Sequence, residues 1–162
     1  MTGSVSSGTA RVTLPADTRV QIVRDFDAGR HQVFRAWTTP DLIRRWWAGD
    51  RGVVDSIEVD LRPGGSWRYV MTAKGGFEVA FHGTYREVVR GERLVHTEVF
   101  EGAPEAAAVT TVTFADRDGG STVTIHVEHS SKANRDLHVE SGMEAGLQEA
   151  LDHLEQVAVS LT

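Results

Sequence analysis

The chain has 162 residues and no cysteine, and its 23 acidic against 17 basic residues give a formal net charge of -6. The length suits one domain, the missing cysteines exclude disulfides and thiolate chemistry, and the negative charge argues against nucleic acid as a partner. No segment reaches the ~20 apolar residues of a membrane span and residues 1–9 lack a secretory signal, so we expect a cytoplasmic protein without membrane insertion.

The N-terminal region is rich in Ser, Gly and Thr and shows no periodicity. The sequence therefore predicts a mobile leader over residues 1–17 and a single domain over residues 18–162. From Thr18 to Phe26 every second residue is placed to face one side, which predicts the first strand of the domain.

Two short helices are expected after this strand. Asp27 can cap the first one, which presents Trp37. The Thr-Pro pair at residues 39–40 is typical of the start of a second helix, and this helix carries the Trp46-Trp47 pair. We therefore expect two short helices between the first two strands.

Between Val53 and His129 apolar runs alternate with Gly-rich turn signals, of which Asp118-Gly119 is the strongest hairpin signal. Consecutive strands with short turns predict an antiparallel meander. With the first strand, the sheet is expected to have six to seven strands.

A long amphipathic helix is predicted at the C-terminus. Ser141 and Glu144 have the spacing of a capping box, and apolar residues then recur at helical spacing to the end of the chain. A single helix covers only one stripe of a sheet, so the sheet must wrap around it and can leave a ligand cavity between them.

Large apolar side chains are expected to face this cavity. Strand alternation places Trp67, Tyr69 and Met71 on one face of their strand, and Phe81 and Tyr85 on one face of the next. These side chains form either an ordinary core or a ligand wall, and the pattern leaves both open.

A polar pair interrupts an apolar strand face at His96 and Glu98, between Leu94 and Phe100. If this face looks into the cavity, the pair can hydrogen-bond a polar ligand or act as general acid and base. If it looks outward, the two side chains are a solvated pair. These residues are the candidates for a catalytic role.

Metal and nucleotide chemistry find no support in the sequence. The run from His126 to His129 splits its ligands between two strand faces, and no phosphate-binding or serine-hydrolase motif is present. We therefore expect no metal and no cofactor.

Several motifs are similar to those of a known family. They are Phe26-Asp27-Ala28, Val33-Phe34-Arg35-Ala36-Trp37-Thr38, Trp46-Trp47, Leu61-Arg62-Pro63-Gly64-Gly65-Ser66-Trp67, Gly83-Thr84-Tyr85-Arg86-Glu87-Val88, Glu92-Arg93-Leu94-Val95 and Gly142-Met143. Over roughly Thr18 to Leu161 the chain resembles the bacterial branch of the activator of heat shock protein 90 ATPase homologue family, in the START-related, birch-pollen-allergen-like superfamily. The resemblance implies an α+β helix-grip fold, a curved antiparallel sheet wrapped around a long C-terminal helix.

This superfamily hosts many activities, so the fold does not fix the function. We expect a small-molecule binding protein, rather than an enzyme, with an internal cavity for a hydrophobic or aromatic ligand. The residues expected to bind the ligand are Trp37, Trp46, Trp47, Trp67, Tyr69, Met71, Phe81, Tyr85, His96, Glu98, Phe100, Met143 and Leu147. Two alternatives remain open: a cyclase- or dehydratase-like enzyme that uses His96 and Glu98, and a co-chaperone that stimulates a chaperone ATPase as a protein partner. Monomer and homodimer are both open.

Overall fold

The computed structural model describes residues 9–161. The strands are β1 (Arg11–Ala16), β2 (Arg19–Phe26), β3 (Gly52–Val59), β4 (Ser66–Ala73), β5 (Glu78–Val89), β6 (Arg93–Phe100), β7 (Ala108–Arg117) and β8 (Gly120–His129). The helices are α1 (Arg30–Thr38), α2 (Pro40–Ile43), α3 (Lys132–Glu140) and α4 (Met143–Val159), with a 3₁₀ turn at Pro104–Ala106.

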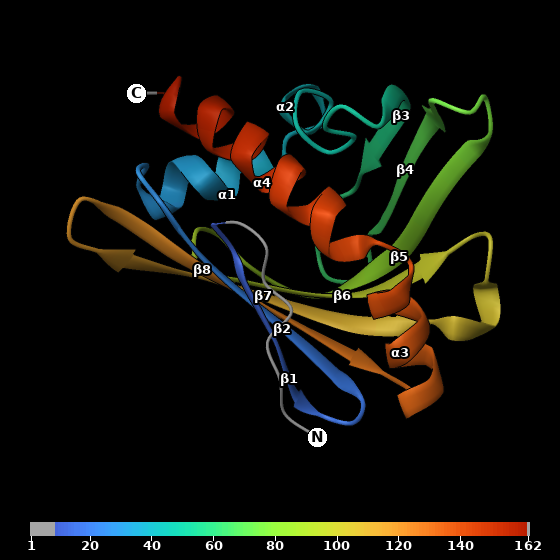
Figure 1. Ribbon diagram of the computed structural model, residues 1–162. Coiled ribbons are helices and arrows are strands. Elements are labelled where there is room, and N and C mark those ends of the chain that lie inside the picture. Colours follow the sequence, from blue (N-terminus) through green and yellow to red (C-terminus); the bar gives the residue numbers. More distant parts are fainter. Residues whose placement is uncertain (1–8, 162) are drawn as a thin grey trace.

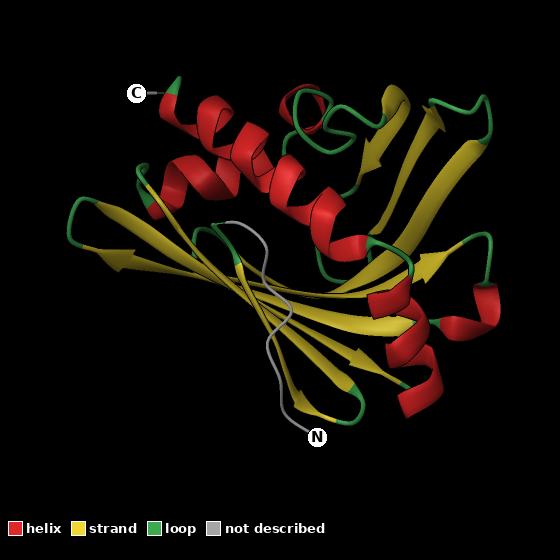
Figure 2. Ribbon diagram, in the orientation of Figure 1, coloured by secondary structure: helices red, strands yellow, loops and turns green. Residues whose placement is uncertain are grey.

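The strands form one antiparallel sheet in the order β1-β2-β8-β7-β6-β5-β4-β3. Figure 1 shows this sheet curling around α4, which crosses its concave side. Helices α1 and α2 lie on the same side of the sheet as α4 (Figure 2). The predicted architecture is confirmed, although the described residues form eight strands rather than six or seven.

The additional strand is β1, which lies within the leader predicted over residues 1–17. Val12 and Leu14 are buried, and Val12 pairs with Ile22 of β2. Polar residues and Pro15 around them hide the short alternation in the sequence, and a proline is tolerated because β1 is an edge strand. The folded domain therefore begins before residue 18, and residues 1–8 of the predicted leader lie outside the described residues.

The two short helices follow β2 as predicted, but the first has another cap. Gly29 is the N-cap of α1, and the Gln32 side chain accepts a hydrogen bond from its backbone N–H at 2.9 Å. The backbone N–H of Asp27 instead donates to Glu155 of α4. Thr39 is the N-cap of α2 as expected.

The C-terminal helical region is divided in two. Gly142 has a φ of 85°, a left-handed conformation that separates α3 from α4. The Ser141 hydroxyl donates to the carbonyl of His138, so it belongs to the end of α3 and does not cap α4. The predicted capping box is therefore wrong, and α3 is an element that the sequence did not predict.

Helix α4 packs against the concave side of the sheet through a row of buried side chains. Leu151, Leu154 and Val157 are buried in the core. Arg24 reaches from β2 under the helix, where it pairs with Asp152 at 2.7 Å and lies over the Phe26 ring. Figure 1 shows that α4 begins on the side of the molecule that holds β3, β4 and β5.

Candidate functional site

A continuous set of aromatic rings lines the sheet near the start of α4. Trp47, which follows α2, lies 5.3 Å from Tyr69 and 6.0 Å from Phe81 between ring centroids. Trp67 lies 4.8 Å from Tyr69, and Phe81 lies 5.2 Å from Phe100. We call this set the aromatic wall: Trp47, Trp67, Tyr69, Phe81, Tyr85 and Phe100.

His96 of β6 belongs to the same surface. Its ring centroid lies 5.2 Å from that of Trp67 and 5.9 Å from that of Tyr85. Its Nδ1 lies 3.1 Å from the carbonyl oxygen of Thr97, which can only accept a hydrogen bond, so Nδ1 carries a proton. Burial lowers the pKa of His96, so its ring is neutral at neutral pH and Nε2 is an acceptor.

Glu98 follows His96 on the same face of β6. Burial raises the pKa of its carboxyl to about 7. The charge of Glu98 contributes, after burial and Tyr85, to the raised pKa of Tyr69, which places the carboxyl within electrostatic reach of the aromatic wall. No residue within 9–161 hydrogen-bonds to this carboxyl. The site thus holds a carboxyl that exchanges its proton near neutral pH.

Small residues stand on both sides of Glu98. The pairs His82–Val99 and Tyr85–His96 place Gly83 opposite Glu98 on β5, and Ala108 pairs with it on β7. A Cβ at position 83 would overlap the carbonyl of Thr97 and come within 2.6 Å of Trp67 Nε1. Trp67 lies across Gly83 and donates to that carbonyl at 3.2 Å, so the glycine is required by this close approach.

Polar atoms outside the predicted set of ligand-binding residues extend this surface across β7 and β8. Thr110 pairs with His96 and is 4% exposed, and no described residue bonds its hydroxyl. His129 pairs with Ala108, and its Nε2 lies 2.9 Å from Nδ1 of His138 on α3. His129 Nδ1 is buried without a partner in the described part of the chain. The pairing of β6 with β7 and of β7 with β8 is what brings these residues near Glu98, so only the strand register could have identified them.

Two of the predicted tryptophans lie elsewhere. Trp37 packs 5.5 Å from Trp46 and 5.7 Å from Phe114 of β7. Trp46 is 6% exposed, and its Nε1 donates to the carbonyl of Ala36 at 2.9 Å. This pair has the contacts of ordinary core residues between α1 and the sheet.

The remaining predicted residues are apolar. Met71 is partly buried on β4, where it pairs with Val54 and Val79. Met143 and Leu147 lie on the first turns of α4 and pack against the core while remaining partly exposed. Both lie at the end of α4 that begins on the side of β3, β4 and β5 (Figure 1).

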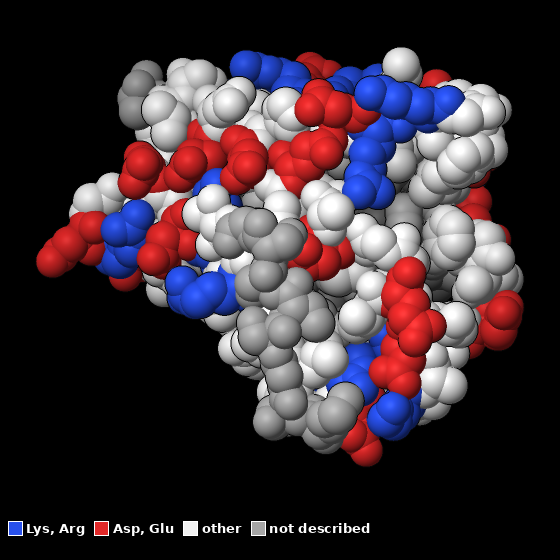
Figure 3. Space-filling view, in the orientation of Figure 1, with Lys and Arg blue, Asp and Glu red and all other residues white. Residues whose placement is uncertain are grey.

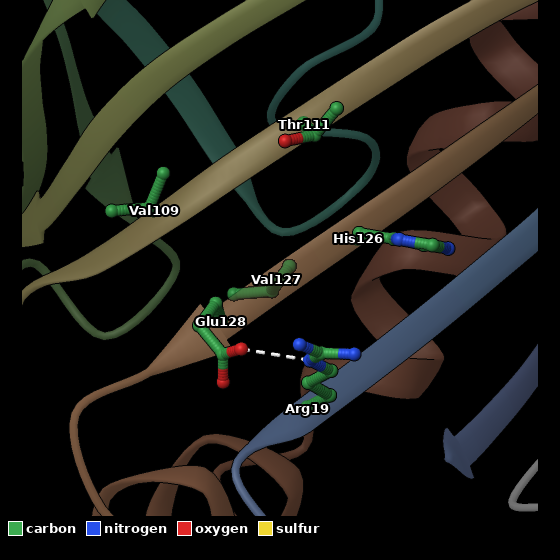
Figure 4. A pocket seen from close by; sticks show the side chains of 6 residues that line it. All are labelled: Arg19, Val109, Thr111, His126, Val127 and Glu128. Atoms are coloured by element: carbon green, nitrogen blue, oxygen red, sulfur yellow. Dashed lines mark hydrogen bonds and ion pairs between the residues drawn. The ribbon is translucent and has the colours of Figure 1, made fainter. Parts of the chain in front are cut away.

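The outer face of the sheet has a shallow hollow of about 220 Å³. Figure 4 shows its lining, in which Arg19 pairs with Glu128 at 2.7 Å. His126 bonds Gln21 at 2.8 Å beside it. These polar side chains in and beside the hollow are thus paired by hydrogen bonds, and they lie on the face of the sheet away from α4. The hollow therefore has the character of a solvated surface.

Residues 9–161 contain no group of three or more His, Asp or Glu side chains that could hold a metal ion. None of the helices described in this range is both long enough and apolar enough to span a membrane.

A curled antiparallel sheet that holds a C-terminal helix on its concave side defines a helix-grip protein. Within this class the chain belongs to the Activator of Hsp90 ATPase homolog 1-like family, whose profile matches residues 27–158. The resemblance stated from the sequence motifs is confirmed.

Solved bacterial structures share the fold. A protein from Rhodobacter sphaeroides is 23% identical, with a TM-score of 0.87 over 94% of this chain and 99% of its own. A protein from Nitrosomonas europaea is 24% identical, with a TM-score of 0.82 over 91% of this chain and 97% of its own. The AHSA1-like protein from Aeromonas hydrophila is 26% identical, with a TM-score of 0.69 over 88% of this chain and 92% of its own. None of the curated proteins compared with the chain matches it.

Proposed function

We propose that the protein binds a small molecule with an apolar or aromatic body between the aromatic wall and the first turns of α4. The observation that carries this proposal is Glu98, a carboxyl that faces aromatic rings and has no hydrogen-bond partner among residues 9–161. A polar group in such surroundings costs free energy that a bound partner would recover.

The neighbouring side chains support the same function. Gly83 and Ala108 lie opposite Glu98 on the two neighbouring strands, and Gly83 allows the Trp67 ring to lie close beside the carboxyl. His96 offers an acceptor at Nε2, and the buried hydroxyl of Thr110 has no partner among the described residues. Sites for small molecules commonly combine apolar walls with a few such polar groups.

The proposal is tested by titrating aromatic and aliphatic small molecules while following tryptophan fluorescence. A ligand at this site lies beside Trp47 and Trp67, so we expect a saturable change in emission. Trp67→Phe should weaken binding by about tenfold, which corresponds to roughly 1.4 kcal/mol, and Glu98→Gln should do the same for ligands with a polar group that contacts the carboxyl.

The matched control is Glu58→Gln, because Glu58 is an exposed carboxylate on the edge strand β3 and should leave binding unchanged. Native mass spectrometry of the protein from its host provides a second measurement. The proposal is wrong if no compound gives a saturable change and no small molecule is released from the purified protein.

A further inference from the structure

Aromatic rings lie on one flank of Glu98, on the strands β4 and β5. Trp67 covers Gly83, and its ring centroid lies 4.8 Å from that of Tyr69 and 5.2 Å from that of His96. The faces of such rings carry negative charge density and attract cations. The carboxylate of Glu98 and the faces of these rings therefore favour the same kind of ligand group, a cation.

The guanidinium of Arg51 lies against Gly146 on the first turns of α4, but no Lys or Arg within residues 9–161 pairs with Glu98 or shifts its pKa. Among the described residues that face α4 from β4, β5 and β6, none is Lys or Arg. Arg24, the buried arginine on β2, is already paired with Asp152 and Glu155. The carboxyl of Glu98 is therefore left without a compensating cation from the described chain.

The surface of the molecule supports the same charge preference. Figure 3 shows acidic side chains in a row along α4, whose sequence contributes Glu149, Asp152 and Glu155. The chain as a whole carries a formal net charge of -6. A surface of this kind attracts small cations and repels small anions.

We infer that the ligand carries a cationic ammonium group, which the Glu98 carboxylate and the rings of Trp67 and Tyr69 bind while its apolar body contacts the rest of the aromatic wall. This inference rests on the proposed function. It adds the chemical class of the ligand, an organic ammonium ion, and the orientation of its charged end.

The pH dependence of binding follows from the groups that face Glu98. They are Tyr69 on β4, Tyr85 on β5, His96 on β6 and His129 on β8 beyond Ala108, and the pKa values of both histidines are lowered by burial. On α4, Glu144 is hydrogen-bonded to Gln148. Glu98 is thus the group that changes charge between pH 6 and pH 8, because its pKa is about 7.

A cation binds the ionised form of Glu98, and this form is a minor species at pH 6 and the major species at pH 8. The apparent affinity for a cation of fixed charge should therefore be about tenfold weaker at pH 6 than at pH 8. A neutral compound of the same shape should show no such change.

The test uses phenyltrimethylammonium, whose charge does not depend on pH, and its neutral isostere tert-butylbenzene. Both are titrated against the full chain at pH 6 and pH 8 at constant ionic strength, with fluorescence and calorimetry as readouts. At pH 8 we expect the cation to bind at least about tenfold more tightly than the isostere. In Glu98→Gln this preference and its pH dependence should disappear, while binding of the isostere is retained.

The retained binding of the isostere shows that the variant is folded, and Glu58→Gln should behave as the wild type. If the isostere binds the wild-type protein as tightly as the cation at pH 8, the ammonium assignment is wrong and the proposed function stands. The same conclusion follows if Glu98→Gln keeps the preference. If neither probe binds at millimolar concentration, the ammonium assignment is contradicted, and the proposed function is decided by the ligand titrations and the native mass spectrometry described above.

Discussion

At the scale of single residues, Glu98 makes stability depend on pH. Burial raises its pKa from 4.5 to about 7, so between these values the folded protein holds a proton that the unfolded chain has released. The free energy of unfolding contributed by this group therefore falls as the pH rises from about 4.5 to about 7. Glu98→Gln, which keeps a neutral side chain, should be more stable than wild type at pH 8 by on the order of 2 kcal/mol, and nearly equal at pH 4.5.

Urea unfolding at the two pH values measures this difference. Glu58→Gln on β3 serves as the control and should change stability by a similar small amount at both. An equal effect of Glu98→Gln at pH 4.5 and pH 8 would show that Glu98 is not desolvated in the folded protein.

Several of these residues could be placed from the sequence, and others could not. Alternation along β4 and β5 predicts the shared face of Trp67, Tyr69 and Tyr85, because a strand has a fixed period of two. Thr110 and His129 could not be connected to Glu98, since their proximity depends on strand register. Alternation alone also could not separate Trp37 and Trp46 from the aromatic wall.

At the scale of elements, α3 is joined to β8 by the contact between His129 and His138, whose ring nitrogens lie 2.9 Å apart. Burial lowers the pKa of His138 to about 4. Burial also lowers the pKa of His129; the charge of Glu128 acts in the opposite direction, and the charge of Arg135 lowers it further. Both histidines bind a proton more readily when α3 is detached from β8. Protonation therefore favours the detached conformation of α3 as the pH falls from about 6.5 to about 4. The docking of α3 should weaken over this window.

Hydrogen–deuterium exchange of α3 measures this effect after correction for the intrinsic exchange rate at each pH. Protection of α3 should decrease between pH 7 and pH 5 while protection of β7 in the centre of the sheet stays constant. His138→Leu should reduce the pH dependence of α3, and the part that remains belongs to His129. An equal loss of protection in α3 and β7 would indicate global unfolding and contradict a local effect.

The elements that the sequence missed are short or interrupted. β1 alternates over only a few residues before Pro15, and α3 has the exposed Leu137 and few buried side chains to mark a helical face. The long elements were predictable because their hydrophobic pattern repeats several times, as in α4. Short elements depend on tertiary contacts, such as the bond from Arg135 of α3 to the carbonyl of Ala16.

At the scale of the whole molecule, the burial of α4 against the sheet provides much of the core. Leu154 is completely buried in this interface, so Leu154→Ala should reduce the free energy of unfolding by about 2–5 kcal/mol. Val159 on the same helix is 43% exposed, and Val159→Ala should cost less than about 0.5 kcal/mol. Chemical denaturation followed by tryptophan fluorescence measures both, and equal losses would contradict the packing of α4 described above.

The strand order also affects the order in which the strands can pair while the chain is being synthesised. Successive strands from β3 to β8 are hydrogen-bonded neighbours, whereas β2 is completed only by β8, near the other end of the sequence. During synthesis the hairpin of β1 and β2 and the hairpins from β3 to β7 can form as they leave the ribosome, while the second edge of β2 waits for β8. That edge of β2 is thus left longest without its partner in a newly made chain, and it is where chaperones would find an exposed strand edge.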